Sequence, residues 1–431
     1  MRKVCWWTRW LPLLLICSFV LAAAPGSAAY SVLTHEEIID LLWDQQIVPL
    51  LKARFPNAIP DDLKTAHAYA YGGSVIQDIG YYPFGDHTFS DLTHYVRTGD
   101  FVQAMLSDAQ DLNEYAFALG ALAHYAGDNN GHRLGTNVAV PVLYPDLRRK
   151  FGGTVTYWDN PLSHLRTEFG FDVLQVAQGR YANDQFRKFI GFKVSKPVLE
   201  RAFADTYGIE LKDIFKSLDL ALGTYRYSTS TVIPGMTKVA WQLKKDTFIK
   251  EIPGITKKKF LYNLSRSSYE KDFGKTYQRP GFETRLISWI LHIVPKSGPF
   301  KSLAFKAPTP EVEKMFMASF NATVDSYRAL LANVAAQHMD LVTDENIDLG
   351  APTVAGGYLG ADLAYDKLLD KLAEHKFVGV SAELRSNMLD YYKDRKPPVA
   401  PATAKTAAAW EKVMQQRTEL EQLQPQTAAT Q

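Results

Sequence analysis

Apolar residues recur at helical intervals through most of the chain. The pattern opens with a capping box formed by Thr34 and Glu37, after which Ile38 to Trp43 follow with helical spacing. Proline and glycine interrupt the pattern near residues 295–310 and 350–360. Further helices are predicted over about residues 61–71, 100–128, 161 onwards, 198–204, 211–222, 285–294, 312–338, 363–376 and 407–423. The spacing therefore predicts an all-α protein built from many helices.

The first 29 residues depart from this pattern. Three basic residues precede an apolar run from Leu11 to Ala23, and small residues follow at positions 25–29. This order predicts a signal peptide, 1–29, that is cleaved near Ala29/Tyr30, and hence a secreted or periplasmic protein. Both cysteines, Cys5 and Cys17, lie inside it. A mature chain that starts at Tyr30 would therefore hold any metal with His, Asp and Glu alone.

Composition and charge narrow the function classes. The 431 residues are 46% hydrophobic and 22% charged, as in a globular protein with room for one large domain or two ordinary ones. The formal net charge is +2, and removal of three basic residues with the signal peptide makes it −1. Bulk charge thus gives no reason to expect a stable nucleic-acid partner. Lys238–Lys275 is locally basic and contains several aromatic residues, so it is either a surface for anionic lipid headgroups or phosphate, or a solvated face.

Candidate chemistry concentrates in the stretch from His124 to His132. His124, Asp128 and His132 are spaced four and four, and on a helix such positions share one face. Eight helical residues rise about 12 Å, so the two histidines would not chelate one ion, whereas Asp128 between them could bridge two. Taken alone, the pattern also fits two half-buried histidines and a solvated aspartate.

The distribution of histidine favours the metal site, because seven of the ten lie between residues 35 and 164. His35 falls in a first helical turn, five residues after the predicted new amino terminus. The α-amino group at that terminus is itself a possible nitrogen ligand for a metal. His35 could equally be a surface residue. Asp78 is a lone carboxylate in a glycine-rich, apolar segment, where a cation would offset its desolvation.

The remaining histidines divide into two sets. His87 and His94 follow Asp78 closely, and His164 and Glu168 lie four apart on the helix that starts after Asn160-Pro161. The others have no evident partner and are interpreted as packing or surface residues: His67, His292, His338 and His375.

Together, residues 30 to about 175 resemble the zinc-dependent phospholipase C family, whose superfamily includes bacterial phospholipases C, GPI-specific phospholipase D and secreted single-strand nucleases. The resemblance implies a multi-helix bundle of this type with three zinc ions. It implies that Tyr30, through its main-chain amino nitrogen and carbonyl oxygen, and His35 hold one zinc together with Asp128. The second zinc would be held by Asp78, His94, His124 and Asp128, and the third by His132, His164 and Glu168.

The chain departs from the family pattern at two points. Tyr30 stands where nucleases and bacterial phospholipases C usually start with Trp, and main-chain atoms bind the metal there. The gap between His124 and His132 is eight residues where the family usually has ten, which is more similar to the GPI-phospholipase D branch. His94 is preferred to His87 as a ligand because its distance from Asp78 is closer to the family's.

The resemblance implies a zinc-dependent phosphodiester hydrolase, and the signal peptide predicts that it is secreted. The spacing similarity and the basic, aromatic stretch 238–275 favour phospholipids as the substrate, and the same stretch is a candidate for peripheral contact with an anionic membrane surface. Asp78 would orient or deprotonate the attacking water as well as bind metal, and Glu168 would be a ligand only. The alternatives are a single-strand nuclease-type phosphodiesterase and a non-catalytic, zinc-stabilised helical binding protein. The predicted organisation is a catalytic domain over 30–190, a helical extension over 191–395 packed on it, and a linker, short helix and disordered tail over 396–431.

Overall fold

The structure is a computed structural model that describes residues 30–181, 184–188, 190–252, 254–263, 304–338, 342–397 and 404–423. The elements of the first half are α2 (Val32–Leu42), α3 (Val48–Arg54), α4 (Pro60–Gly73), a 3₁₀ helix (Ile76–Tyr81), α5 (His87–Tyr95), α6 (Thr98–Asp108), α7 (Leu112–Gly131), α8 (Asn137–Leu143), α9 (Pro145–Phe151), α10 (Pro161–Gln178) and α11 (Asp184–Arg187). The later elements are α12 (Lys196–Tyr207), α13 (Leu211–Ile214), α14 (Leu218–Tyr227), α15 (Ile233–Glu251), α16 (Lys257–Asn263), α19 (Pro310–Ala335), β1 (Glu345–Asn346), β2 (Ala351–Pro352), α20 (Leu359–Glu374), α21 (Ala382–Lys393) and α22 (Ala404–Gln422).

The predicted all-α fold is confirmed. Within the described ranges the only strands are β1 and β2, which pair antiparallel over two residues each. The predicted signal peptide, the helix expected over 285–294, His292 and the tail after residue 423 lie outside the described residues. No helix in the described part of the chain combines the length and the apolar character needed to cross a membrane.

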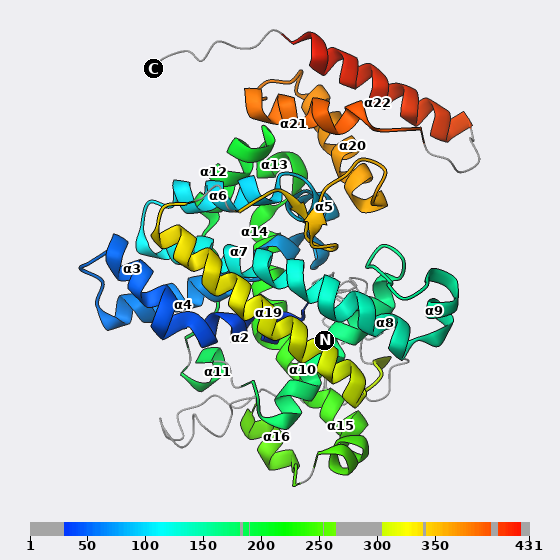
Figure 1. The fold of residues 1–431 in the computed structure, drawn as a ribbon. Coiled ribbons are helices and arrows are strands. Elements are labelled where there is room, and N and C mark those ends of the chain that lie inside the picture. Colours follow the sequence, from blue (N-terminus) through cyan, green and yellow to red (C-terminus); the bar gives the residue numbers. More distant parts are fainter. Residues whose placement is uncertain are drawn as a thin grey trace, which may run out of the picture.

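Helix α7 runs through the middle of the molecule, with α2, α4, α6 and α19 packed around it (Figure 1). Its contact with α4 is close because both helices carry glycine there. A Cβ on Gly120 would lie 2.1 Å from the carbonyl oxygen of Ala70, and a Cβ on Gly73 would lie 1.9 Å from that of Phe117. Only glycine permits this approach, which brings the chain that follows α4 to the face of α7 that carries His124.

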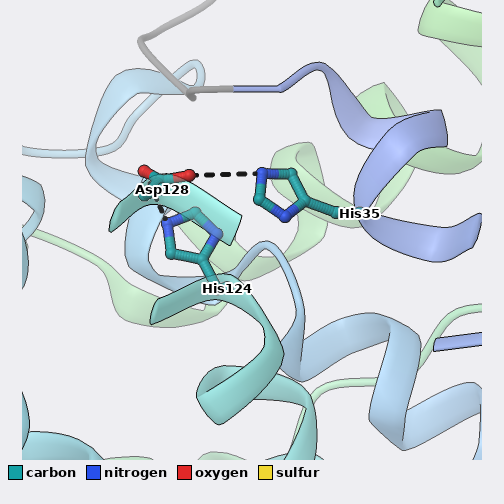
Figure 2. A group of neighbouring side chains, drawn as sticks. All are labelled: His35, His124 and Asp128. Atoms are coloured by element: carbon teal, nitrogen blue, oxygen red, sulfur yellow. Dashed lines mark ion pairs between the residues drawn. The ribbon is translucent and has the colours of Figure 1, made fainter. Parts of the chain in front are cut away.

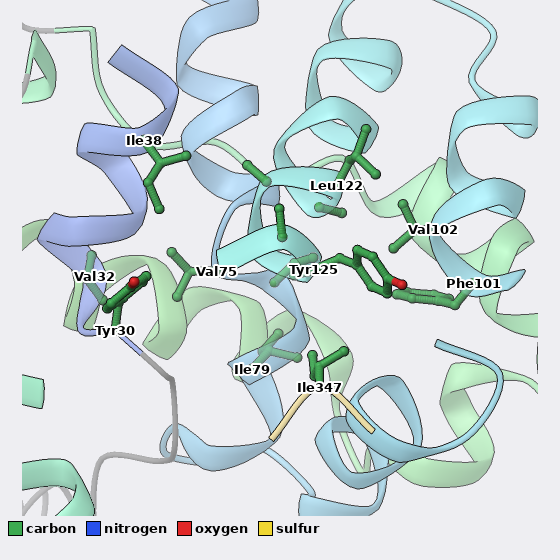
Figure 3. Close-up of a cluster of buried hydrophobic side chains, with 14 of the residues drawn as sticks. Tyr30, Val32, Ile38, Val75, Ile79, Phe101, Val102, Leu122, Tyr125 and Ile347 are labelled. Carbon is green, nitrogen blue, oxygen red and sulfur yellow. The ribbon is translucent and has the colours of Figure 1, made fainter. Parts of the chain in front are cut away.

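Helices from both sides of residue 190 share one buried hydrophobic cluster. Helix α19 lies across α7, where the Tyr327 hydroxyl donates a hydrogen bond to the carbonyl oxygen of Leu119 at 2.8 Å. Figure 3 shows Ile347, which follows β1, among the buried side chains of this cluster. The chain after residue 300 therefore helps to build the core around the metal-capable residues.

Two helix boundaries differ from the sequence prediction. The single helix expected over 100–128 is two, α6 and α7, because the Asp111 side chain accepts hydrogen bonds from the backbone N–H groups of Asn113 and Glu114 and starts a new helix. The segment 211–222 likewise divides between α13 and α14. The spacing of apolar residues continues through such a break, so it did not reveal either one.

The predicted capping box of Thr34 and Glu37 is wrong. Helix α2 begins at Val32, and the side chain of its N-cap residue makes no capping hydrogen bond. Instead the Asp172 carboxylate accepts hydrogen bonds from the backbone N–H groups of Leu33 (3.0 Å) and Thr34 (3.1 Å), and from the Thr34 hydroxyl (2.6 Å). A carboxylate from α10 thus fixes the first turn of α2, the turn that carries His35.

Candidate metal centre

Helix α7 places His124 and Asp128 one turn apart and then continues as a π-helical turn over His132–Thr136. The helix therefore survives the Asn129-Asn130-Gly131 stretch. The Nε2 atoms of His124 and His132 lie 3.3 and 3.5 Å from Oδ2 of Asp128, and all three side chains are fully buried. Asp128 stands between the two histidines as the spacing predicted.

His35 reaches the same carboxylate from α2. Its Nε2 lies 3.5 Å from Oδ1 of Asp128, and its ring stacks on that of His124 with centroids 4.7 Å apart (Figure 2). Gly127 makes room for this ring, since a Cβ there would lie 3.0 Å from the His35 ring. Figure 2 shows His35 directed from α2 toward the two α7 residues, so the first ligand group comes from two helices.

Asp78 and His94 complete a second group with His124. The 3₁₀ helix after α4 supplies Asp78, and α5 supplies His94. Nε2 of His94 lies 3.4 Å from Oδ1 of Asp78 and 3.3 Å from Oδ2 of Asp128. Among the described residues no group donates a hydrogen bond to either carboxylate oxygen of Asp78, although both are buried. A buried carboxylate in this state is costly to ionise, and a bound cation would offset that cost.

Backbone carbonyls fix the orientation of two of these imidazoles. Nδ1 of His94 donates to the carbonyl oxygen of Ser90 at 2.7 Å, and Nδ1 of His124 donates to that of Ser74 at 3.0 Å. Each bond places a proton on Nδ1 and leaves Nε2 as the ring atom that faces the carboxylates. This arrangement is usual for histidines that bind metal.

The third group contains His132, His164 and Glu168. Nδ1 of His164 lies 2.7 Å from Oε1 of Glu168, and Nε2 lies 2.8 Å from Oδ1 of Asn137. Burial, followed by the nearby His132, holds the pKa of His164 well below its ordinary value, so the ring is neutral and has one N–H. If that N–H donates to Asn137, Nδ1 and Glu168 face each other as two acceptors, which a cation would stabilise.

The distances in the first two groups fit a shared ion better than hydrogen bonds. Two ligand atoms, each about 2.1 Å from a tetrahedral zinc ion, are about 3.4 Å apart. The histidine–carboxylate distances of 3.3 to 3.5 Å match this value and exceed the usual hydrogen-bond length. The donor set is entirely nitrogen and oxygen, which zinc accepts. The residues present therefore fit bound zinc.

The pKa shifts in the cluster also favour bound positive charge. Burial alone would lower the pKa of His94 and of His124, but the carboxylates of Asp128 and Asp78 outweigh it and raise both values. Burial, followed by the neighbouring His124, lowers the pKa of His35 to about 3, so this ring is a neutral donor. Burial raises the pKa of Asp78. The cluster thus gathers buried carboxylates that positive charge would stabilise in their ionised form.

The structure brings eight of the predicted ligands into these three groups: His35, Asp78, His94, His124, Asp128, His132, His164 and Glu168. His87, the alternative to His94, is exposed at the start of α5. The Tyr30 side chain points away toward α19, where its hydroxyl donates to Ser319 Oγ at 2.8 Å, and its ring lies 5.9 Å from that of His35. The role expected of its main-chain atoms stays a prediction.

A fourth group of metal-capable side chains, Asp40, His67 and Asp184, differs in character. Nε2 of His67 is hydrogen-bonded to Oδ1 of Asp40 at 2.8 Å, and its ring stacks on Trp43. Asp184 pairs with Lys188 at 2.8 Å. Each of these side chains thus has a polar partner within the protein, which agrees with the structural role predicted for His67.

Sequence reasoning missed three polar residues at the centre. Asp172 continues the four-residue spacing of His164 and Glu168 on α10, so the same periodicity could have indicated it. Asn137 holds His164 through its amide oxygen. Asp348, from the turn between β1 and β2, lies 3.2 Å from His132 Nε2, and no sequence pattern connects the two.

Residues 34–217 match a protein-family model described as zinc dependent phospholipase C. The matched range contains the eight predicted ligands that the structure brings together, whereas Tyr30 precedes it and Asp348 follows it. Comparison with curated proteins and with solved structures gave no match.

Proposed function

This chain belongs, through residues 34–217, to the zinc-dependent phospholipase C family, and we propose that it is a secreted zinc hydrolase that cleaves phosphodiester bonds in phospholipids. The family implies a zinc-dependent phospholipase. The observation that carries the proposal is the convergence of three His/Asp/Glu groups on a buried strip of α7 around Asp128. Such a cluster of buried carboxylates and imidazoles is costly unless positive charge balances the carboxylates, and bound cations would supply that charge.

The chain's own residues have distinct parts in this chemistry. His35, His124 and Asp128 would hold one zinc, with the main chain of Tyr30. Asp78, His94, His124 and Asp128 would hold the second, and His132, His164 and Glu168 the third. When bound, zinc supplies the Lewis acidity that activates water and stabilises negative charge on a phosphodiester.

Asp78 is placed to handle the proton of the attacking water. Its carboxylate is buried, accepts no hydrogen bond from the described residues, and has a pKa that burial raises. A raised pKa makes a carboxylate a better proton acceptor near neutral pH. Asp128 is less suited to this part, because the surrounding histidines outweigh burial and hold its pKa well below the ordinary value. We therefore assign orientation or deprotonation of water to Asp78.

The aromatic surroundings favour a lipid over a nucleic acid. The Tyr81 ring lies 6.0 Å from that of His94 and 5.9 Å from that of Tyr157. Tyr81 is only 2% exposed and so presents no ring face on which a base could stack. By contrast, Val354 and Leu359 are 61% and 59% exposed and flank Tyr358, whose hydroxyl reaches Asp348 beside the third group. Apolar side chains at this position suit acyl chains.

In the basic segment after Lys238, the residues available for surface contact differ from those that the sequence suggested. Its aromatic residues Trp241, Phe248 and Phe260 stack on one another and are buried, so they are not surface contacts. Lys245, Ile249 and Lys250 on α15 are exposed instead. A mixed basic and apolar helix surface suits peripheral contact with an anionic membrane, which remains part of the proposal. Residues 264–303 lie outside the described ranges.

A substrate comparison tests the proposal. We expect the zinc-loaded protein to hydrolyse phosphatidylcholine in mixed micelles and to release little nucleotide from single-stranded DNA. Asp78→Asn should lower phospholipid hydrolysis by about 10²-fold or more, because removal of one general base costs about 10²–10⁴-fold. Asp146→Asn, on the exposed surface of α9, should keep the wild-type rate.

Other outcomes separate the alternatives. Preferred cleavage of single-stranded DNA would favour the nuclease-type phosphodiesterase. Bound zinc without hydrolysis of either substrate, or of a chromogenic bis-phosphodiester, would favour a zinc-stabilised binding protein.

Metal removal should lower stability. We expect about two to three zinc ions per native chain by elemental analysis. An excess of a strong chelator should lower the thermal midpoint, because each site filled at 100 times its Kd contributes about 2.7 kcal/mol to the free energy of unfolding. Refilling with zinc should restore the midpoint. A native protein without bound metal, or one whose midpoint ignores the chelator, would overturn the metal-centre assignment.

A further inference from the structure

Asp348 reaches the metal centre from a part of the chain outside the family match. It lies in the turn that joins β1 and β2 and is fully buried. Its Oδ2 accepts hydrogen bonds from the hydroxyls of Tyr95 at 2.7 Å and Tyr358 at 2.6 Å. Its Oδ1 has no hydrogen-bond partner among the described residues and lies 3.2 Å from Nε2 of His132. One oxygen is thus anchored, while the other faces a predicted zinc ligand.

His132 also has buried polar atoms without a hydrogen-bond partner. Within the described residues neither of its ring nitrogens makes a hydrogen bond, although the ring is fully buried. Its Nε2 lies between Asp348 Oδ1 at 3.2 Å and Asp128 Oδ2 at 3.5 Å. These distances resemble the separation of about 3.4 Å expected for two ligands of one tetrahedral zinc. Buried polar atoms normally have a partner, and a metal ion between Asp348 Oδ1 and His132 Nε2 would serve both.

We propose that Asp348 is a further zinc ligand, in the group that contains His132, His164 and Glu168; the inference rests on the metal centre of the proposed function. It adds a carboxylate oxygen to two imidazoles and one carboxylate. Four protein ligands complete a tetrahedral site, and zinc accepts both imidazole nitrogen and carboxylate oxygen. The C-terminal part of the chain then completes a site whose other ligands lie within residues 34–217.

The turn that carries Asp348 is held by hydrogen bonds to one predicted ligand and to a residue that contacts another. The backbone N–H of Ile347 donates to the carbonyl oxygen of His94 at 3.1 Å, and the Asn137 amide donates to the carbonyl oxygen of Asp348 at 2.8 Å. Asn137 also contacts His164, so it links the turn to the third group.

Gly350 closes the turn against α7. Its φ of +59° is one that L side chains rarely adopt, and a Cβ there would lie 2.4 Å from the carbonyl oxygen of Asn129. The backbone of the turn therefore lies directly on the end of α7, beside His132. This backbone contact helps to hold the Asp348 carboxylate beside His132.

The test compares zinc retention in full-length variants against a competing chelator. Asp348→Asn should lose one zinc equivalent at a chelator concentration at which the wild type keeps its full content, with an affinity at least about 10-fold lower. Tyr358→Phe is the matched control, since it removes a hydrogen bond to the same carboxylate but leaves the oxygen that faces His132. It should keep the wild-type zinc content.

Thermal midpoints with zinc and with chelator distinguish a ligand from a structural hydrogen-bond acceptor. If Asp348 is a ligand, addition of zinc should raise the thermal midpoint less in Asp348→Asn than in Tyr358→Phe. A structural role would lower the midpoints of Asp348→Asn equally in both conditions and leave its zinc content unchanged, which would overturn the proposal.

Diffraction from wild-type crystals at the zinc edge gives an answer that needs no variant. An anomalous peak about 2.0–2.2 Å from Asp348 Oδ1 is expected. A peak at the third group that lies well beyond this distance from Asp348 would refute the inference and leave the proposed function intact. Absence of zinc from the wild-type protein would instead refute the metal centre itself.

Discussion

Replacement of Asp128 by asparagine is expected to remove most activity and more than one zinc ion. The Asp128 carboxylate lies within 3.5 Å of the Nε2 atoms of His35, His94, His124 and His132. It therefore contacts histidines of all three predicted zinc groups. An asparagine keeps the volume but loses the charge and one acceptor oxygen. Loss of an outer partner of a ligand already costs about 10–100-fold, so loss of a shared ligand should cost at least about 100-fold in kcat/KM.

The matched control for Asp128→Asn is Asp362→Asn. Asp362 is also buried. It accepts a hydrogen bond from the Tyr391 hydroxyl at 2.6 Å and pairs with Arg395 at 3.1 Å, but it lies on α20, which carries none of the predicted ligands. Its variant should lose stability and keep its zinc. Elemental analysis and phospholipid hydrolysis measure both proteins. Full zinc content in Asp128→Asn would show that the carboxylate is not a shared ligand.

One additional residue before Tyr30 is expected to lower activity by a similar factor and to release one zinc ion. The extension converts the α-amino group into a peptide nitrogen, which has no lone pair for a metal. The side chain should stay in place, since its hydroxyl bonds Ser319 at 2.8 Å and its ring packs edge-on against Phe316 at 5.5 Å. The fold should therefore survive while one ligand is lost, and circular dichroism with elemental analysis can show both.

Tyr30→Phe with an unextended amino terminus is the control for that experiment. It removes the hydrogen bond to Ser319 but keeps the α-amino group, so zinc content and activity should stay close to wild type. If the extended protein were as active as the unextended one and held as much zinc, the assignment of Tyr30 would be wrong. Amino-terminal sequencing of the secreted protein would test cleavage before Tyr30 directly.

The sequence by itself determined the all-α fold and the local geometry of the metal-capable pairs. His124 with Asp128, and His164 with Glu168, lie on one helix face because four residues make about one turn, whatever surrounds the helix. The rise between His124 and His132 likewise separated them into different groups, as the structure has them. Resemblance to a family then connected His35, Asp78 and His94 to these pairs, which spacing alone could not do.

The tertiary structure alone decided which distant residues complete the centre. Asp348 contacts His132, although more than two hundred residues separate them in the sequence. Asp172, on α10, accepts the hydrogen bonds at the start of α2 in place of the predicted cap. Helical periodicity shows on which face of its own helix a residue lies. It does not show which other segment packs against that face. Such contacts arise from the packing of α7 against other helices and from the position of the β1–β2 turn, both of which depend on the whole folded chain.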